Sequence, residues 1–547
     1  MSQTGAQILV ETLERAGVDR VFGLVGSTVL EILDEVEQHD GIDYVSTRHE
    51  QVAASMAAGY ALAARKPSVS ISHVGPGAAN QIIGVAAAFR DDVPVISITG
   101  NEESHTLGKD VNHEWDVTGV FERFTKHSVQ VTHDDPFGRI RNAVLQAQTG
   151  MPGAVHLDVP EDVAESPHDA PSPRAYDRIE AATGRVSRTP SRPPAEAVRR
   201  SVELLSEAER PLVVAGAELR WFDAEDALRA FAETLDVPVA TAQNARGALS
   251  ENHPLSLGYV ANSGIDPTNE YFASADYVLA VGTRLSDKTT KGWTMIDEEA
   301  TLVQATIDAA NLDRYYTADV GMLADPRSTL EALTREAASL DRSFESVAAE
   351  ARAAYVEERE RLLEPAPHDG DGVDPRRVVT AVRERATDLA YATGGGVHNT
   401  YPRLLPVDDM NGRFVTANFT GMSQGLPLAM GAKVALPDRD VVAFEGDGGF
   451  AMVMQDMETL VRESIPVKII LLNNDAYMSH AVRQRDRYDR FVGTHHGNPA
   501  YDAVAEEFGL VGLRATADDE VEDAVADLFE ADGPALLDVH VDPELGA

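Results

Sequence analysis

The segment from Asp440 to Asp475 carries residue types that could hold a metal ion and a phosphate. It reads DVVAFEGDGGFAMVMQDMETLVRESIPVKIILLNND. The pattern predicts a buried strand over 441–444, a tight turn over 446–449 and a helix from Phe450 onward. In open α/β sheets, ligands lie at the carboxyl ends of strands, where glycines let them approach the backbone closely. We therefore expect Gly446, Gly448 and Gly449 to face a bound phosphate.

A second apolar strand ends in polar residues at a matching distance. The run 467–472 is followed by Asn473-Asn474, and Asn474 lies 27 residues after Asp447. Adjacent parallel strands would bring the Asp447 carboxylate and the Asn474 side-chain oxygen to one point. With the Ala476 carbonyl, a water and two phosphate oxygens, they would complete the octahedral oxygen shell that Mg²⁺ prefers. The predicted metal ligands are Asp447, Asn474 and Ala476.

Strands and helices alternate along most of the chain. Apolar runs of strand length, such as PSVSISHVG, VPVISITG, PLVVAG and YVLAVG, are separated by amphipathic helical stretches. This alternation predicts an α/β fold with parallel sheets flanked by helices. Two stretches rich in Pro and charged or small polar residues, at 165–195 and 363–375, are interpreted as linkers. Three domains are therefore expected, at 1–165, 195–345 and 375–547.

The GDG and NN pair resembles the diphosphate motif of thiamine-diphosphate enzymes. Three other segments resemble the same family in the expected order: TRHEQVAASMAAGYALA, HVGPGAAN and FTGMSQGLPLAMGAKVALPDR. RPLVVAG, NARGALSENHPLSLG and LAVGTRLSD look like the central domain of acetolactate synthases. The resemblance covers nearly the whole chain. It implies a pyrimidine-binding domain, a central domain and a diphosphate-binding domain, with thiamine diphosphate and Mg²⁺ as cofactors.

The resemblance also implies roles for single residues. Glu50 matches the family's activating glutamate, which protonates the aminopyrimidine so that the thiazolium can form its ylid and attack a 2-oxo acid. Met422, in the same segment as Thr420, matches the hydrophobic residue that bends the cofactor. GGGVHNTY resembles the stretch that reaches the diphosphate, which adds four candidate cofactor contacts: Gly396, Val397, His398 and Asn399. An acidic residue usual in that stretch is replaced by Gly394.

Three histidines stand where acetolactate synthases carry other residues. After Asn474 the sequence DAYMSHAVRQ lacks the Gly-Met-Val and the Trp that select the second 2-oxo acid. His480 falls where pyruvate-type decarboxylases have a catalytic Glu, and His73 takes the place of the catalytic His of benzoylformate decarboxylase. His113 replaces a Gln. Imidazoles shuttle protons near neutrality, so all three are candidate catalytic residues, and each could instead be a hydrogen-bonded structural histidine. His495-His496 is interpreted as a solvated pair.

The resemblance leaves four functions open. The first is a carboligase like acetolactate synthase, which joins a decarboxylated 2-oxo acid to a second carbonyl. The second is a non-ligating decarboxylase like pyruvate or benzoylformate decarboxylase. The third is an acyltransferase such as sulfoacetaldehyde acetyltransferase, because the segment RFVGT resembles a stretch of that enzyme. A non-catalytic paralogue is the fourth, and the retention of Glu50, Asp447 and Asn474 argues against it.

Composition and resemblance together set the expected partners. The 547 residues include no Cys, which excludes thiolate chemistry. A net charge of −42, with seven Lys against forty Arg, argues against nucleic acid and anionic membranes and is typical of proteins adapted to molar salt. With no signal peptide or apolar span, we expect a cytoplasmic protein. The resemblance implies a homodimer or dimer of dimers and leaves a regulatory subunit open. LSDKT and YVANSG match the flavin-contacting stretches poorly, which does not support FAD.

Overall fold

The structure is a computed structural model that describes residues 2–183, 191–260, 262, 264–366, 368, 372–386, 388–543 and 545. Parts of both expected linkers and of the YVANSG stretch lie outside these ranges. The chain folds into two compact units: Met1–Val186 with Pro367–Asn399 and Phe414–Ala547, and Ser187–Ala366 with Thr400–Arg413. No described helix is long and apolar enough to cross a membrane.

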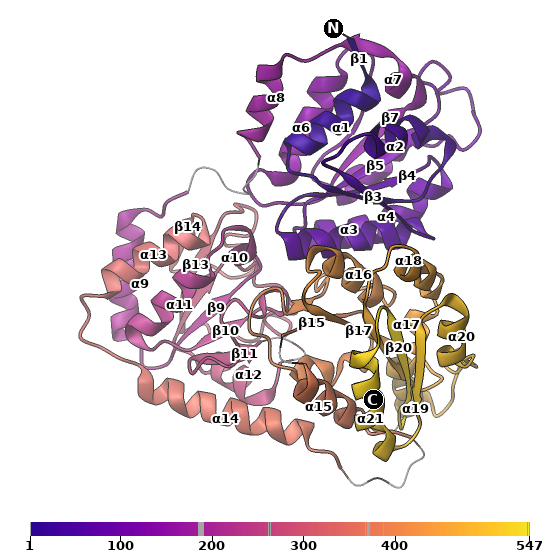
Figure 1. Ribbon diagram of the computed structural model, residues 1–547. Helices are drawn as coiled ribbons and strands as arrows, with labels where there is room; N and C mark the ends of the chain where they lie inside the picture. Colours follow the sequence, from indigo (N-terminus) through magenta and orange to yellow (C-terminus); the bar gives the residue numbers. More distant parts are fainter. Residues whose placement is uncertain are drawn as a thin grey trace. The chain divides into compact units, whose positions relative to one another are not determined.

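The first sheet has six strands in the order β3-β2-β4-β5-β7-β6, and all its pairings are parallel (Figure 1). Its strands are β2 (Arg20–Gly23), β3 (Asp43–Ser46), β4 (Ser68–Ser72), β5 (Val95–Asn101), β6 (Ser128–Gln130) and β7 (Val155–Pro160). Its helices are α1 (Gly5–Arg15), α2 (Leu30–Glu37), α3 (Glu50–Ala64), α4 (Pro76–Arg90), α5 (Val117–Phe121), α6 (Pro136–Gln148) and α7 (Glu161–Glu165). Strands β4 and β5 are buried along their whole length because helices cover both faces.

The central sheet has the order β11-β10-β9-β12-β13-β14, with parallel pairings. Its strands are β9 (Pro211–Ala215), β10 (Val239–Thr241), β11 (Ser256–Tyr259), β12 (Tyr277–Val281), β13 (Thr301–Thr306) and β14 (Val320–Leu323). Its helices are α9 (Ala195–Glu207), α10 (Glu218–Trp221), α11 (Glu225–Leu235), α12 (Asp266–Ala273), α13 (Pro326–Ala337) and α14 (Glu345–Leu363). This order, 3-2-1-4-5-6 within the domain, is that of dinucleotide-binding sheets.

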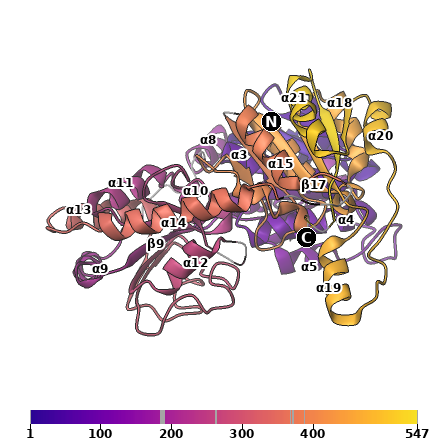
Figure 2. The ribbon, with the colours of Figure 1, turned by 90° about the horizontal axis from the view of Figure 1, so that it is seen from below.

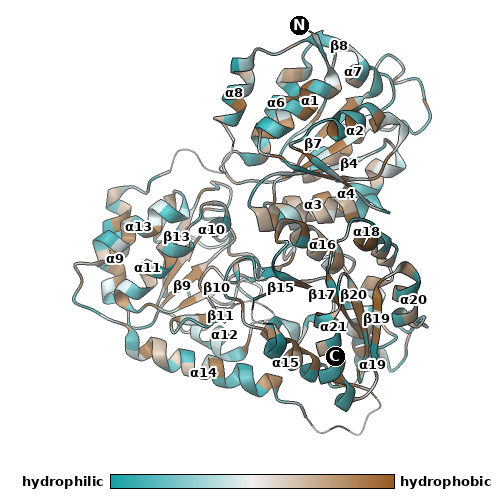
Figure 3. Cartoon of the chain, viewed as in Figure 1, coloured by the Kyte–Doolittle hydropathy of each residue, from teal (hydrophilic) through white to brown (hydrophobic). Residues whose placement is uncertain are grey.

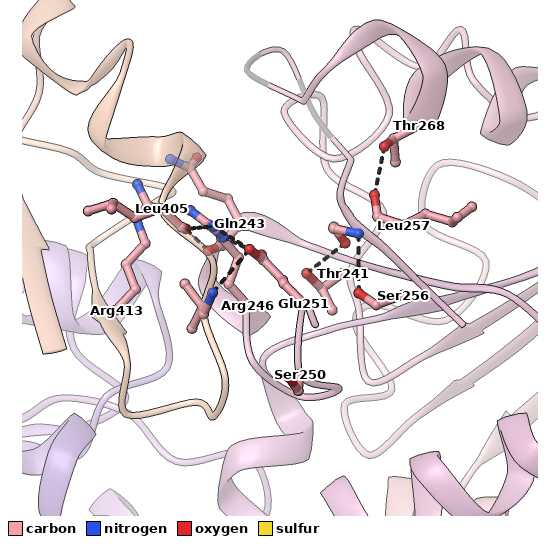
Figure 4. Close-up of polar contacts among 12 residues, drawn as sticks. Thr241, Gln243, Arg246, Ser250, Glu251, Ser256, Leu257, Thr268, Leu405 and Arg413 are labelled. Atoms are coloured by element: carbon pink, nitrogen blue, oxygen red, sulfur yellow. Dashed lines mark hydrogen bonds and ion pairs between the residues drawn. The ribbon is translucent and has the colours of Figure 1, made fainter. Parts of the chain in front are cut away.

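A buried ion pair joins two parts of this central unit. The Arg246 guanidinium donates to both oxygens of the Glu251 carboxylate at 2.6 Å and to the Leu405 carbonyl at 2.7 Å (Figure 4). Nearby, the Thr268 hydroxyl donates to the Leu257 carbonyl at 2.6 Å. The two charges are paired and fully hydrogen-bonded, which is the condition under which a protein interior tolerates them. The pair thereby ties the 400–413 segment to the central sheet.

The third sheet repeats the topology of the first. Its order is β16-β15-β17-β18-β20-β19, so both sheets read 2-1-3-4-6-5 in chain order. Its strands are β15 (Leu389–Thr393), β16 (Arg413–Phe414), β17 (Asp440–Gly446), β18 (Lys468–Asn473), β19 (Val511–Ala515) and β20 (Ala535–His540). Its helices are α15 (Pro375–Arg385), α16 (Gly425–Ala435), α17 (Asp447–Phe450), α18 (Met457–Arg462), α19 (Met478–Tyr488), α20 (Tyr501–Phe508) and α21 (Val521–Glu530). The strands are hydrophobic and the outer helix faces are hydrophilic (Figure 3). The expected α/β fold with three helix-flanked parallel sheets is confirmed.

Two local predictions were wrong. The expected linker at 165–195 contains β8 (Pro167–Asp169), which pairs with β1 (Ser2–Thr4), and helix α8 (Pro173–Glu180). This helix forms because Tyr176 and Ile179 pack into the first domain's core. The helix expected from Phe450 onward is also absent. The strand β17 passes directly into the one-turn helix α17, and the chain then turns twice so that Phe450, Val453 and Met457 are all buried.

Helices α3 and α16 pack closely against each other and join the first and third domains into one unit (Figure 1). Their backbones approach at two glycines. A Cβ on Gly59 would lie 2.3 Å from the Leu428 carbonyl oxygen, and one on Gly431 would lie 1.9 Å from the Met56 carbonyl oxygen. Both glycines are therefore required by the close crossing rather than by backbone conformation.

Candidate active site

A cavity of about 250 Å³ opens at the carboxyl ends of the third sheet's central strands. Strands β15, β17 and β18 are neighbours in this sheet, so the segments that follow them meet at one edge. The first turn of α19 forms another wall, and the rest of this helix projects from the domain (Figure 2). The lining residues are Gly395, Gly396, Val397, His398, Thr420, Met422, Gly446, Asp447, Gly448, Gly449, Leu472, Asn474, Ala476, Tyr477, Met478, Ser479 and His480.

The three residues expected to bind metal all line this cavity. Asp447 begins α17 and is 2% exposed, and burial raises the pKa of its carboxyl. Asn474 follows β18, and its side-chain oxygen accepts a hydrogen bond from the Ala476 amide at 3.3 Å. Carboxylate, amide and carbonyl oxygens form the donor set of a hard divalent cation. A cation at this point would compensate the buried Asp447 charge, so the residues fit Mg²⁺.

Two glycines of the GDG segment are packed closely against neighbouring cavity residues. A Cβ on Gly448 would lie 2.4 Å from the Tyr477 ring, and one on Gly449 would lie 2.4 Å from the Met422 carbonyl oxygen. The Met422 Cε atom lies 3.5 Å from the Gly448 Cβ position. The Met422 side chain therefore extends over the GDG segment. Both glycines are therefore required by the contacts that the GDG turn makes with Tyr477 and with the Met422 backbone.

The GGGVHNT segment places three of its four candidates on the cavity wall. His398 is buried, which lowers its pKa to about 4, and its Nε2 atom has no hydrogen-bond partner in the described part of the chain. His398 also lines the cavity, which places a neutral imidazole beside any ligand bound there. Gly396 and Val397 also line the cavity, whereas Asn399 does not. At Gly394 a Cβ would lie 2.6 Å from the Met422 carbonyl oxygen, so this position is closed to the acidic residue expected there.

Thr420, in the loop that precedes α16, also lines the cavity. Its hydroxyl donates to the Thr416 carbonyl at 2.6 Å. The Glu445 carboxylate, fully buried behind the same loop, accepts a hydrogen bond from the Leu426 amide at 2.6 Å. Burial raises the pKa of Glu445 to about 8. These contacts hold the Met422 loop against the end of β17.

Glu50 lies in a different place, at the first turn of α3. It is 8% exposed, and its Oε2 atom accepts a hydrogen bond from the Asn80 side chain at 3.0 Å. Its Oε1 atom lies 3.2 Å from the Cβ position of Gly77, so only glycine leaves this oxygen free of contact there.

His73 and His113 lie together beside Glu50. The His73 Nε2 atom is 3.3 Å from the His113 Nδ1 atom, and the two rings meet edge to face at 5.3 Å. The His73 Nδ1 atom lies 2.8 Å from the Thr28 hydroxyl. Burial, followed by the charge of His113, lowers the pKa of His73. Two imidazoles in contact can pass a proton between them.

The structure thus forms two clusters from the expected site residues. Glu50, His73 and His113 lie in the first domain, whereas His480, in the first turn of α19, lines the third domain's cavity with the three expected metal ligands. Within the described part of the chain, no residue of the first domain lines the third domain's cavity. His480 is exposed, and its backbone amide donates to the Tyr477 carbonyl at 2.9 Å.

Sequence reasoning missed two residues and misjudged a third. Tyr477 lines the cavity, and Asn498 donates to the Asp447 carboxylate at 2.8 Å. His496 was expected to be solvated, but its ring lies against Tyr477 at 4.8 Å, and its Nε2 atom is 3.3 Å from Asp447 Oδ2. The interpretation failed because a polar, glycine-containing stretch usually stays in solvent. Here the stretch folds back over the loop that carries the expected metal ligands Asn474 and Ala476.

Three family models match the chain in order. They are described as the N-terminal TPP binding domain (residues 3–120), the central domain (198–333) and the C-terminal TPP binding domain (394–539) of thiamine pyrophosphate enzymes. The central range contains the whole central sheet, whereas the first range ends before β6 and β7 and the third begins just after β15. The C-terminal match contains the whole cavity.

Curated proteins align with almost the entire chain. An acetolactate synthase large subunit of Parasynechococcus marenigrum is 31% identical over 98% of this chain and 87% of its own length. The acetolactate synthase isozyme 2 large subunit of Escherichia coli is 31% identical over 98% of this chain and 95% of its own. A probable acetolactate synthase large subunit of Methanocaldococcus jannaschii is 30% identical, with 98% and 92% covered. The chain therefore belongs to the thiamine pyrophosphate enzyme family, as an enzyme similar to acetolactate synthase large subunits.

Proposed function

We propose that this enzyme uses thiamine diphosphate and Mg²⁺ to decarboxylate a 2-oxo acid and to join the product to a second carbonyl compound. One observation carries the proposal. A buried carboxylate, Asp447, and the oxygen donors of Asn474 and Ala476 line one glycine-walled cavity at the carboxyl edge of a parallel sheet. The acetolactate synthase names of its relatives support the carboligation step.

Different residues of the cavity would contact different parts of the cofactor. Asp447, Asn474 and Ala476 would hold Mg²⁺, and Gly446, Gly448, Gly449 and the Gly396–Asn399 stretch would hold the diphosphate. Met422 would support the cofactor from the side of α16. When bound, thiamine diphosphate supplies the electron sink that lets CO₂ leave a 2-oxo acid.

Glu50 and the two histidines would move protons. The Glu50 carboxyl, oriented by Asn80, would donate its proton to the aminopyrimidine ring. His73, whose pKa is lowered by burial, would exchange protons with His113 across 3.3 Å and would protonate the oxygen of the reacting carbonyl or remove the proton from the hydroxyl formed from it. His480, which lines the cavity, would contact the substrate from the third domain, whereas the other two histidines belong to the first.

The His73–His113 pair also favours a second candidate, a decarboxylase that does not ligate. A proton relay next to the reacting carbon would release a free aldehyde by protonating it before a second carbonyl binds. Incubation with pyruvate, followed by a panel of 2-oxo acids, separates these functions by product. Acetolactate or a homologous hydroxy acid supports the carboligase, free aldehyde supports the decarboxylase, and an acyl phosphate formed from sulfoacetaldehyde and phosphate supports the acyltransferase. Consumption of none of these substrates, at any salt concentration, would refute all three.

We further propose that the site is completed by a second subunit in a homodimer or a dimer of dimers. The Glu50 cluster does not line the cavity of its own chain, although Gln51, the next residue, donates a hydrogen bond to Ser423 beside Met422. Inactive Glu50→Gln and inactive Asp447→Ala chains, dissociated and mixed, should then regain about a quarter of wild-type activity per chain. Half of the dimers are mixed, and one of the two sites in each is intact.

The mixing experiment should be run in molar KCl and again in dilute buffer. The net charge of −42 makes subunit association dependent on screening. Activity that stays absent after verified subunit exchange would mean that one chain builds the whole site.

A further inference from the structure

Asn498 holds three oxygen atoms at the end of the sheet that carries the metal ligands. Its side-chain nitrogen lies 2.8 Å from Asp447 Oδ2, 2.9 Å from Asn473 Oδ1 and 2.9 Å from Asp475 Oδ1. An amide nitrogen has two hydrogens, so these acceptors share them. The nitrogen thus links the end of β18 to the start of α17.

Neighbouring groups fix the orientation of the side-chain amides of Asn498 and Asn473. The Tyr501 hydroxyl donates to Asn498 Oδ1 at 3.1 Å, which turns the Asn498 nitrogen toward Asp447. The Asn473 nitrogen donates to the buried Asp538 carboxylate at 3.0 Å, which leaves the Asn473 oxygen for Asn498. Burial raises the pKa of Tyr501 to about 12, so its hydroxyl keeps the proton that it donates. Tyr501 is itself held edge to face against Phe450 at 5.4 Å.

The backbone around Asn498 is tied to the metal-binding loop as well. The Tyr477 amide donates to the Thr494 carbonyl at 2.8 Å, and the His496 amide donates to the Asp475 carbonyl at 3.0 Å. The 494–498 segment therefore follows the loop residue by residue. Neither His496 nor Asn498 lines the cavity, whereas Asp447 and Asn474 do, so the segment approaches the loop from outside the cavity.

We propose that Asn498 is a positioning residue that holds the Asp447 carboxylate in the orientation needed for Mg²⁺, an inference that rests on the proposed function. The two Asp447 oxygens are held separately, one by the Gly448 amide at 2.9 Å and the other by Asn498. With both oxygens held, the carboxylate cannot rotate about its side-chain bonds. Outer partners of this kind orient metal ligands, and their loss weakens metal binding by ~10–100-fold.

The test measures metal affinity directly. Mg²⁺ is titrated calorimetrically into the dimeric enzyme in the presence of saturating thiamine diphosphate, for the wild type and for Asn498→Ala. We expect Mg²⁺ to bind the variant ~10–100-fold more weakly, and we expect excess Mg²⁺ to restore both cofactor affinity and turnover. The matched control is His495→Ala, because His495 lies in the same segment, is exposed and, within the described part of the chain, directs its ring to Thr494 and Phe491. Its Mg²⁺ affinity should be unchanged.

A second variant keeps the test valid if Asn498→Ala does not fold. Tyr501→Phe retains the ring that packs on Phe450 and removes only the hydroxyl that orients Asn498, so its Mg²⁺ affinity should fall by several-fold. Wild-type Mg²⁺ affinity in either folded variant would overturn the inference. A loss of turnover that excess Mg²⁺ does not reverse would overturn it too, because it would indicate a general structural role. Failure of the wild type to bind Mg²⁺ would instead refute the proposed function.

Discussion

Replacing Gly431 with Ala tests the helix crossing that joins the first and third domains. Within a helix this substitution ordinarily stabilises a protein by about 1 kcal/mol, because alanine has the higher helix propensity. At Gly431 the added Cβ would lie 1.9 Å from the Met56 carbonyl oxygen and 2.8 Å from the Tyr60 amide nitrogen. Ordinary contacts begin at about 3.4 Å, so α3 and α16 would have to separate by roughly 1.5 Å or deform. The methyl group has no rotatable side-chain bond, and the atoms that it meets belong to the backbone of α3. Neither can therefore move aside by a change of rotamer.

Overpacking of this kind costs about 1–3 kcal/mol, and the clash with backbone places Gly431→Ala at the upper end. After the gain in helix propensity, we expect the free energy of unfolding to fall by about 1–2 kcal/mol. Turnover should fall further, because α3 begins at Glu50 and α16 follows the Met422 loop, and a displacement of ~1 Å at a reacting group can cost ~10²-fold.

Urea unfolding followed by circular dichroism measures the first effect, and steady-state turnover with saturating cofactors measures the second. Gly497→Ala is the control, because its Cβ would meet no atom within 4 Å. Its stability should change by less than about 0.5 kcal/mol. A Gly431→Ala enzyme as stable as the wild type, or more stable, would refute the close crossing.

Three further perturbations address the proton-moving groups and the core. Glu50→Gln should bind thiamine diphosphate nearly normally but lose ~10²–10⁴-fold in cofactor C2–H exchange and turnover, and a loss below tenfold would count against Glu50. His73→Ala and His113→Ala should each lower turnover with little effect on thermal stability; a loss of about 1–3 kcal/mol without a kinetic defect would indicate structural histidines. Burial lowers the pKa of His156 from 6.5 to about 3. The native state therefore binds fewer protons than the unfolded state between these values, so His156 contributes stability that is fully present above pH 6.5 and is lost as the pH falls toward 3. The loss should reach roughly 3 kcal/mol by pH 4.5, and His156→Gln should flatten that decline in urea-unfolding measurements.

The sequence was sufficient for the elements whose pattern is local. The runs ending at Gly446 and Asn473 are apolar and short, so they predicted two buried neighbouring strands, and the fold places both in one parallel sheet. Strand ends in such a sheet share an edge, and for that reason Asp447, Asn474 and Ala476 could be expected together. The cavity wall at Met422 and His398 followed only from the resemblance to a known family.

The sequence was insufficient where distant segments meet. Asn498 lies 51 residues after Asp447, in a polar stretch with no apolar period, and nothing in its pattern indicates that it folds back onto the proposed metal-binding loop. The pairing of His73 with His113 depends on the loop near residue 113, whose His113 takes a positive φ of 65° and lies against Gly75. Helix α8 was missed because Pro173, which is tolerated in the first turn of a helix, was interpreted as a linker residue.

The central claim is that Asp447 and Asn474 hold a metal-bound diphosphate in the third domain's cavity. Isothermal titration of thiamine diphosphate in the presence of Mg²⁺ tests it most directly, with the wild type compared with Asp447→Ala and Asn474→Ala. Each substitution removes a metal ligand and leaves the diphosphate charge uncompensated, so the account predicts that both variants lose measurable cofactor binding while the wild type retains it. Wild-type affinity in both variants would contradict the metal assignment and, with it, the proposed site.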